Sequence, residues 1–172
     1  SHMGYALAGV ATGTGYGYTS TIIYITIYVI MNIGTFACLY LMKVDGKYTE
    51  KIDDLSGLSK QKPLLALSFL ILFFSLAGIP PLGGFFAKFF VFMSVIESEL
   101  YALAIIGLLT TVISAFYYLK VIKVIYFDET KVNFDEIRNV TVKTTIVLSC
   151  LILSLFFISP SSINLLLSGL FI

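Results

Sequence analysis

The chain has 172 residues, of which 58% are hydrophobic and only 12% charged, with a formal net charge of +1 and a mean hydropathy of +0.97. Soluble domains carry roughly twice that charged fraction, so this composition excludes a cytosolic enzyme, a nucleic-acid-binding protein and a secreted disulfide-rich scaffold. Residues 1–42, 63–87, 100–119 and 144–172 contain no Lys, Arg, Asp or Glu. Each stretch reaches the roughly 20 residues that a helix needs to cross a bilayer, which predicts an all-α integral membrane protein with a single transmembrane domain over residues 1–172.

The first apolar segment, residues 1–12, is too short to span a bilayer. We interpret it as the end of a helix whose beginning is missing. Ser1-His2-Met3 is either native sequence inside that helix or a remnant of cloning. A glycine-rich break at residues 13–17 precedes a complete span at residues 18–42.

The glycine-rich break offers one alternative function. Thr14-Gly15-Tyr16-Gly17 is similar to the potassium filter Thr-Val-Gly-Tyr-Gly with one residue missing. A potassium channel subunit therefore stays open as an alternative, although clusters of glycine usually mark turns.

Two polar loops, residues 43–62 and 128–143, separate the remaining apolar segments. The first loop holds five lysines and four acidic residues. Residues 63–96 follow it, then the acidic turn with Glu97 and Glu99, a span at residues 100–127 and a last helix at residues 144–158. Both basic loops fall on one side of the membrane only if residues 63–96 cross it once, so the positive-inside rule favours a single broken helix over a hairpin. We therefore expect four complete spans plus the leading fragment, with the loops on the cytoplasmic or matrix side and the C-terminus opposite.

Residues 63–96 are interrupted by Gly78-Ile79-Pro80-Pro81-Leu82-Gly83-Gly84. Two prolines in succession cannot continue a helix, and an unwound segment at membrane depth must be buried in protein or face a water-filled cavity. The expected break residues are Gly78, Pro80, Pro81, Gly83 and Gly84.

Lys88 follows this break and is the only charged residue between positions 63 and 96. A lysine inside a membrane segment is costly and is a functional hypothesis by default. Burial disfavours the ammonium form of Lys88. The positive N-terminal end of the second half of the broken helix, which starts just before Lys88, acts in the same direction. Both effects suit a group that loads and releases a proton. The alternative is that Lys88 extends its side chain to the membrane interface.

Other polar residues are weaker candidates. His2 is a candidate proton relay, and Lys120 is a weak candidate because it lies near a helix end, where lysines commonly reach the interface. We interpret Cys38 and Cys150 as small core residues. Six further side chains either line a hydrated path or make helix-packing contacts: Asn32, Thr35, Ser75, Thr110, Thr111 and Ser114.

Three stretches carry a resemblance to a known family: Ser1-His2-Met3-Gly4-Tyr5-Ala6-Leu7, the run from Ser75 to Phe89 that contains the break, and Tyr117-Tyr118-Leu119-Lys120-Val121. Together they resemble the antiporter-like membrane subunits of respiratory complex I, and they are most similar to the C-terminal part of the subunit 2 family of NADH:ubiquinone oxidoreductase. The middle run is long and specific, whereas the outer two are supportive only.

The resemblance implies a fold of two inverted repeats, each with a broken helix that carries a proton-transfer lysine. Residues 63–96 would be the broken helix of the second repeat, Lys88 its lysine, and His2 a histidine of a preceding helix. The first repeat, with its own lysine–glutamate pair, has no counterpart in this sequence. We expect it to be a separate polypeptide from a split gene or a part missing from this chain.

By this resemblance the chain is a proton-translocating subunit of proton-pumping NADH:ubiquinone reductase, with no redox centre or other cofactor of its own. FMN, iron–sulfur clusters and ubiquinone would be held by partner subunits. The expected partners are other membrane-arm subunits, the missing N-terminal part and membrane lipids, with no nucleic acid. The strong excess of Lys over Arg and the absence of Trp suit an AT-rich genome, which favours the mitochondrial inner membrane, with the bacterial plasma membrane as the alternative.

Alternatives from other classes remain open at this point. An Mrp-type cation/proton antiporter subunit would share the broken helix and Lys88 but would exchange sodium without NADH. A structural or assembly protein of the membrane would tolerate the loss of Lys88 without a change in transport.

Overall fold

The computed structural model describes residues 2–48, 51–136 and 139–156. Within these ranges the long segments are all helical, as predicted, and the first polar loop adds a small hairpin and two short helical turns that the sequence did not indicate. The elements are α1 (His2–Ala11), α2 (Gly15–Tyr40), β1 (Lys43–Val44), β2 (Lys47–Tyr48), η1 (Ile52–Leu55), α3 (Leu58–Gln61), α4 (Pro63–Ala77), α5 (Gly83–Glu97), α6 (Tyr101–Phe127) and α7 (Val140–Leu155).

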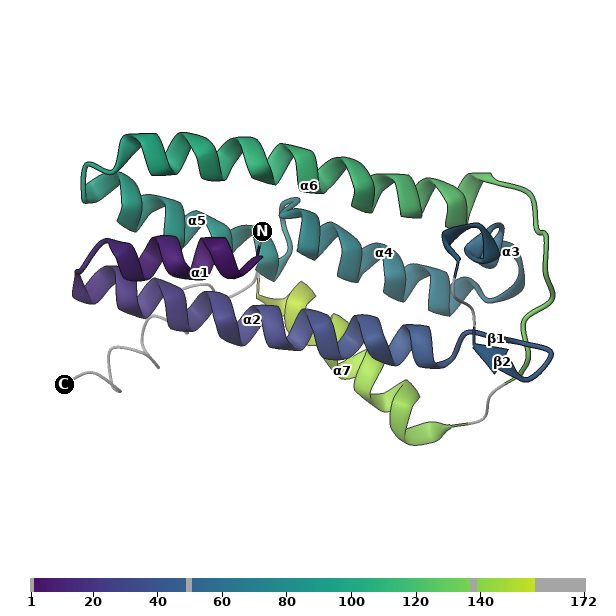
Figure 1. Cartoon of the computed structure of the whole chain (residues 1–172). Helices are drawn as coiled ribbons and strands as arrows, with labels where there is room; N and C mark the ends of the chain where they lie inside the picture. Colours follow the sequence, from purple (N-terminus) through teal and green to yellow (C-terminus); the bar gives the residue numbers. More distant parts are fainter. Residues whose placement is uncertain (1, 49–50, 137–138, 157–172) are drawn as a thin grey trace.

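The helices form an elongated bundle in which α2 and α6 run the full length (Figure 1). The helices α4 and α5 lie end to end and together cover the length of α6, so residues 63–96 pass once along the bundle. This agrees with a broken helix and not with a hairpin. The polar loops gather at one end of the bundle, and the α1–α2 and α5–α6 turns lie at the other end.

Only α2 and α6, of the described helices, are by length and composition long and apolar enough to cross a membrane alone. The prediction of four complete spans is therefore met in part. The helices α4 and α5 have 15 residues each because the break divides them, and α7 has 16. The expected stop at Ser159-Pro160-Ser161 lies outside the described residues.

Side-chain caps move two helix starts toward the N-terminus. The hydroxyl of Thr14 accepts a hydrogen bond from the backbone amide of Gly17 at 3.1 Å, so α2 begins at Gly15 and not at position 18. The side chain of Asn139 accepts from the amide of Val142 at 3.2 Å, so α7 begins four residues earlier than expected. Such caps satisfy amides that have no partner in the first turn of a helix.

Gly15 and Gly17 lie in the first turn of α2, so the potassium-filter alternative is wrong. A Cβ at Gly17 would lie 1.9 Å from the hydroxyl oxygen of Thr12 and 2.5 Å from the carbonyl oxygen of Gly9. Gly17 and Gly9 thus allow α1 and α2 to pack closely. A filter would instead need an extended loop with carbonyl groups facing a pore.

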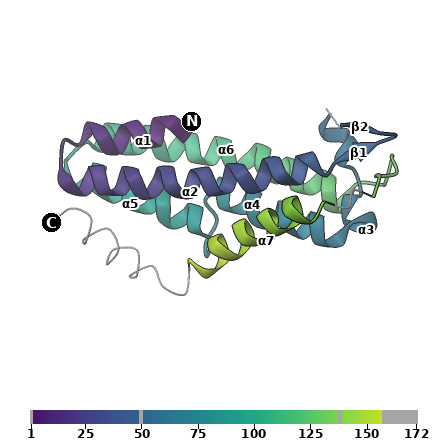
Figure 2. The same cartoon turned by 90° about the horizontal axis from the view of Figure 1, so that it is seen from below.

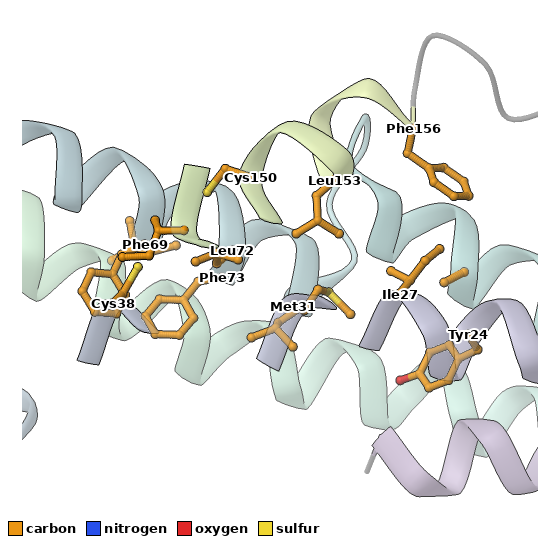
Figure 3. Packing of buried hydrophobic residues seen from close by; sticks show 14 of the residues in the cluster. Tyr24, Ile27, Met31, Cys38, Phe69, Leu72, Phe73, Cys150, Leu153 and Phe156 are labelled. Atoms are coloured by element: carbon orange, nitrogen blue, oxygen red, sulfur yellow. The ribbon is translucent and has the colours of Figure 1, made fainter. Parts of the chain in front are cut away.

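Part of the core lies between α2, α4 and α7, where Cys38, Leu72 and Cys150 gather in Figure 3. The same cluster of buried residues extends to α1, α5 and α6 through Tyr5, Val91 and Ile125. Cys38 and Cys150 are both buried in it, which confirms their interpretation as core residues. By contrast, α6 exposes large apolar side chains such as Val112 and Phe116, at 70% and 73% of their surface. An apolar outer surface of this extent is typical of a protein that faces lipid or other membrane subunits.

The two polar loops hold each other at their end of the bundle. Asp135 accepts a hydrogen bond from the amide of Gly46 at 2.7 Å through its carboxylate, and its own amide donates to the carbonyl of Lys43 at 2.9 Å. The side chain of Gln61 accepts from the amide of Phe134 at 3.0 Å. These contacts fix the end of α2 relative to the starts of α4 and α7. Figure 2 shows these helix ends from below.

Candidate functional site

The break between α4 and α5 begins with a glycine turn. Gly78 adopts a positive φ of 85°, and its amide donates to the carbonyls of Phe74 and Ser75 at 3.0 Å each. The amide of Ile79 donates to the carbonyl of Phe74 at 2.9 Å. A helix leaves its last four carbonyls without intrahelical partners, and this turn satisfies two of the four at the end of α4.

Lys88 satisfies the other two carbonyls at the end of α4. Its side chain is only 4% exposed, and its Nζ donates to the carbonyls of Leu76 at 3.0 Å and Ala77 at 3.1 Å. The predicted lysine therefore lies buried at the break, and the alternative in which it reaches the membrane interface is wrong. In the absence of a side chain at Gly78, the lysine fits beside the turn, because a Cβ there would lie 3.0 Å from its Cδ.

The glycines at the start of α5 are part of the helix and not of the break. The break covers residues 78–82, and Gly83 and Gly84 form the first turn of α5. A Cβ at Gly84 would lie 1.9 Å from the carbonyl oxygen of Ser75, and the Gly84 amide donates to the hydroxyl of Ser75 at 3.0 Å. Gly84 thus allows α5 to start in direct contact with the last turn of α4.

His2 lies at the middle of the bundle because α1 begins there, close to the start of α5 (Figure 1). Its ring is buried and forms two hydrogen bonds, from Nδ1 to the hydroxyl of Tyr24 at 2.8 Å and from Nε2 to the hydroxyl of Tyr118 at 2.9 Å. The ring of Tyr28 stacks on it, with 4.9 Å between centroids. Because a tyrosine hydroxyl both donates and accepts, His2 keeps both partners whether it is neutral or protonated.

Tyr5 lies between the two candidate proton carriers. The Nζ of Lys88 is 5.2 Å from the centroid of the Tyr5 ring, and the rings of Tyr5 and His2 meet edge to face at 6.2 Å. The Tyr5 hydroxyl is hydrogen bonded to Thr111 at 2.8 Å and Thr110 at 3.2 Å, both on α6. The structure therefore brings Lys88 and His2 into one buried polar cluster built from α1, α2, α5 and α6.

Opposing influences act on the ammonium form of Lys88. Burial disfavours it, as the sequence indicated, whereas the two helix-end carbonyls favour it, which the sequence did not reveal. Among the described residues no carboxylate forms an ion pair with Lys88. A neutral amine still has two N–H groups for the two carbonyls, so the third position on Nζ can be either a proton or a lone pair without loss of either bond.

Lys120 does not belong to this cluster. It lies on the exposed side of α6, and its neighbour Lys123 forms an ion pair with Asp128 at 3.5 Å near the helix end. Asn32 and Thr35 bond to carbonyls of their own helix at 2.8 Å.

The tyrosines of the cluster were not predicted as site residues. Tyr24 and Tyr28 are four residues apart and share one face of α2, which is a signal the sequence contains. Their pairing with a histidine 22 and 26 positions earlier depends on how α1 packs, and the sequence gives no indication of that. In the described part of the chain no group of three or more His, Cys, Asp or Glu side chains could hold a metal ion.

A protein-family model matches about two-thirds of the chain. The family described as NADH:quinone oxidoreductase/Mrp antiporter, transmembrane, matches residues 1–114, which include His2, the break and Lys88.

Curated relatives agree with this match. The chain is 56% identical over 162 residues to NADH-quinone oxidoreductase subunit N of Pelagibacter ubique, which covers 94% of this chain and 34% of the relative. It is 46% identical over 160 residues to the protein of the same name from Rhodospirillum rubrum, covering 93% and 33%. The relatives are named subunit N and not subunit 2, and the chain spans about a third of their length.

Solved structures show the same fold. A chain of respiratory complex I from Thermus thermophilus with bound NADH superposes with a TM-score of 0.79 at 27% identity, covering 95% of this chain and 34% of that chain. A chain of the Mrp complex from a Dietzia species superposes with a TM-score of 0.76 at 21% identity, covering 97% and 39%. The second likeness concerns the fold alone.

Proposed function

Because this chain belongs to the NADH:quinone oxidoreductase/Mrp antiporter family of transmembrane proteins, we propose that it is a proton-translocating part of the membrane arm of an NADH:quinone oxidoreductase. The relatives named subunit N support this choice within the family. The observation that carries the proposal is the buried Lys88, which caps a broken helix and lies in one cluster with His2.

In this proposal Lys88 is the proton carrier of the site. Its Nζ takes up a proton from one side and releases it to the other, while the Leu76 and Ala77 carbonyls hold the nitrogen in place. His2 acts as a relay, and the hydroxyls of Tyr24 and Tyr118 orient its ring in both protonation states. In this proposal energy enters as a change in the charges around this cluster, driven by NADH oxidation and quinone reduction in partner subunits.

The rest of the assignment follows the family. We infer a single transmembrane domain with four spans, in which α4 and α5 form one broken span, α1 is part of a fifth helix, and the whole is the second of two inverted repeats. The remaining two-thirds of the relatives' length would supply the first repeat. FMN, iron–sulfur clusters and the quinone site would belong to partner subunits of the complex.

The relatives change the expected location. The relatives compared with this chain come from bacteria, so they do not support a location in the mitochondrial inner membrane. We propose the plasma membrane of a bacterium, with the polar loops on the cytoplasmic side, where lysine-rich loops of membrane proteins accumulate.

Two substitutions of Lys88 test the proposal in the assembled complex in liposomes. Lys88→Arg keeps donors for the two carbonyls but stays protonated at any accessible pH, so the helix break should survive while proton pumping and coupled quinone reduction fall together. Lys88→Met removes the donors as well. Lys120→Met, on the exposed side of α6, is the matched control and should pump normally. Full pumping stoichiometry in Lys88→Arg would overturn the role of Lys88.

The Mrp-type antiporter is the second candidate, favoured by the shared fold of the Dietzia chain. It predicts sodium-dependent proton exchange in liposomes without NADH. Sodium exchange that is lost in Lys88→Arg, in the absence of any NADH-oxidising partner, would favour this candidate over the first.

A further inference from the structure

A pocket of about 470 Å³ opens at the end of the bundle where the polar loops meet, away from the Lys88 cluster. It lies between the end of α2, the start of α4 and the start of α7. Its walls are mostly apolar and include Leu64, Leu65, Ile146 and Val147. This volume is within the range of ordinary ligand sites, ~300–1,000 Å³.

The charged groups of the pocket are two lysines and one acid. Lys62 precedes α4, Lys143 lies in the first turn of α7, and Glu136 comes from the second polar loop. The Nζ of Lys62 donates to the backbone carbonyl of Asp135, which fixes its position. Burial lowers the pKa of Lys62, and the nearby carboxylate of Asp135 opposes this effect. Among the lining side chains two lysines from separate elements stand against the one acid, Glu136, and the carboxylate of Asp135 lies close to Lys62.

The apolar walls continue onto the outer surface of the protein. Leu64 is 80% exposed and Val147 54% exposed, and both lie within two turns of the N-terminal ends of helices that begin at the basic loops. With the polar loops at the membrane surface, as in the proposed topology, headgroups would meet acyl chains at this level. The pocket would then present ammonium groups at headgroup height and an apolar groove that opens toward the hydrocarbon.

We propose that this pocket binds an acidic phospholipid, with the phosphate between Lys62 and Lys143 and an acyl chain along Leu64 and Val147. Basic pockets between membrane helices on the cytoplasmic side suit such headgroups, and acidic lipids are enriched in that leaflet. A soluble anion would use the lysines but not the walls. The lipid would join the first turns of α4 and α7, and so stabilise the outer end of the broken helix.

The test uses the full chain in detergent, titrated with phosphatidylglycerol and, separately, phosphatidylcholine, with bound lipid counted by native mass spectrometry. One lysine near an anionic headgroup is worth a factor of roughly 5, so the pair is worth roughly 30. Lys62→Gln/Lys143→Gln should weaken phosphatidylglycerol binding by about that 30-fold factor and leave phosphatidylcholine unchanged. Lys60→Gln/Lys131→Gln removes the same charge from outside the pocket lining and is the matched control.

Two further variants keep the proposal falsifiable if the loss of Lys62 disturbs the loops. Lys143→Gln alone changes an exposed side chain and should weaken binding roughly 5-fold. Val147→Trp fills the mouth with both lysines intact and should also reduce binding. Equal phosphatidylglycerol binding by the pocket and control variants would overturn the proposal, as would a site filled equally well by inorganic phosphate. NADH plays no part in this assay, so its outcome is independent of the proton-transfer role.

Discussion

The tightest backbone contact at the helix break gives the sharpest test of its geometry. Gly84→Ala adds a Cβ that would lie 1.9 Å from the carbonyl oxygen of Ser75 and 2.7 Å from its carbonyl carbon. Both atoms are backbone, so no side-chain rotation relieves the contact. The first turn of α5 must move away from α4 until this distance exceeds 3.0 Å.

The displacement has a cost that can be worked from the contacts. Overpacking a tight interior costs roughly 1–3 kcal/mol. The hydrogen bond from the Gly84 amide to Ser75, 3.0 Å long and buried, would break, at about 1–3 kcal/mol for the group left without a partner. We expect a total of roughly 2–6 kcal/mol, which lowers the unfolding midpoint by about 6–18 °C at about 3 °C per kcal/mol for a chain of this size.

The chain supplies its own reporter for this measurement. Its two cysteines, Cys38 and Cys150, are both buried, so a thiol-reactive dye gains fluorescence only as the bundle opens. The purified chain of 172 residues in detergent, heated with the dye, gives the midpoint for each variant. The same preparation tests the folding of the Lys88 variants.

The adjacent glycine is the matched control. A Cβ at Gly83 would meet its nearest neighbour, Cδ2 of Leu153, at 3.4 Å, an ordinary contact distance. Alanine is also the better helix former, by up to about 1 kcal/mol. Gly83→Ala should therefore melt within a few degrees of the unchanged chain. If Gly84→Ala melts at the same temperature as Gly83→Ala, α5 does not start in contact with α4, and the account of the break given above is wrong.

Two further substitutions test other parts of the fold with the same assay. Tyr118→Phe leaves Nε2 of buried His2 without its partner and should cost about 1–3 kcal/mol, whereas Tyr28→Phe keeps the stacked ring and should cost less; equal losses would contradict the hydrogen bond. Asp135→Ala removes the acceptor for the Gly46 amide and should speed hydrogen exchange in residues 43–48 with little effect on the bundle; unchanged exchange there would show that the loops do not depend on this contact.

Charge placement and proline chemistry were enough to predict the helices and the single passage of residues 63–96. The expected segments agree with the described helices to within a few residues, and the break could be located because Pro80 and Pro81 cannot continue a helix. The helix starts were missed by three or four residues where Thr14 and Asn139 act as caps. Both residues are typical caps, so the sequence contains this signal. The expected starts were instead placed where the apolar stretches begin.

The loops and the tyrosine cluster could not be predicted in the same way. The contact between Asp135 and Gly46 joins residues 89 positions apart, and that between His2 and Tyr118 joins residues 116 apart. Neither contact can be predicted from the spacing of apolar residues within one helix or strand. Whether a tyrosine in an apolar helix faces lipid or a buried histidine depends on how the helices rotate against one another, and no single-chain pattern fixes that rotation.

The break gives a physical reason for a lysine at position 88. A helix that stops inside the membrane leaves carbonyls that water cannot reach, and here two of them need donors from outside the turn. An arginine would supply the donors but never release a proton, and an apolar residue would supply none. A lysine has donors for both carbonyls in its protonated and in its neutral state. The capping requirement and the proposed proton-carrying role therefore favour the same side chain, and the Lys88→Arg and Lys88→Met variants separate the two.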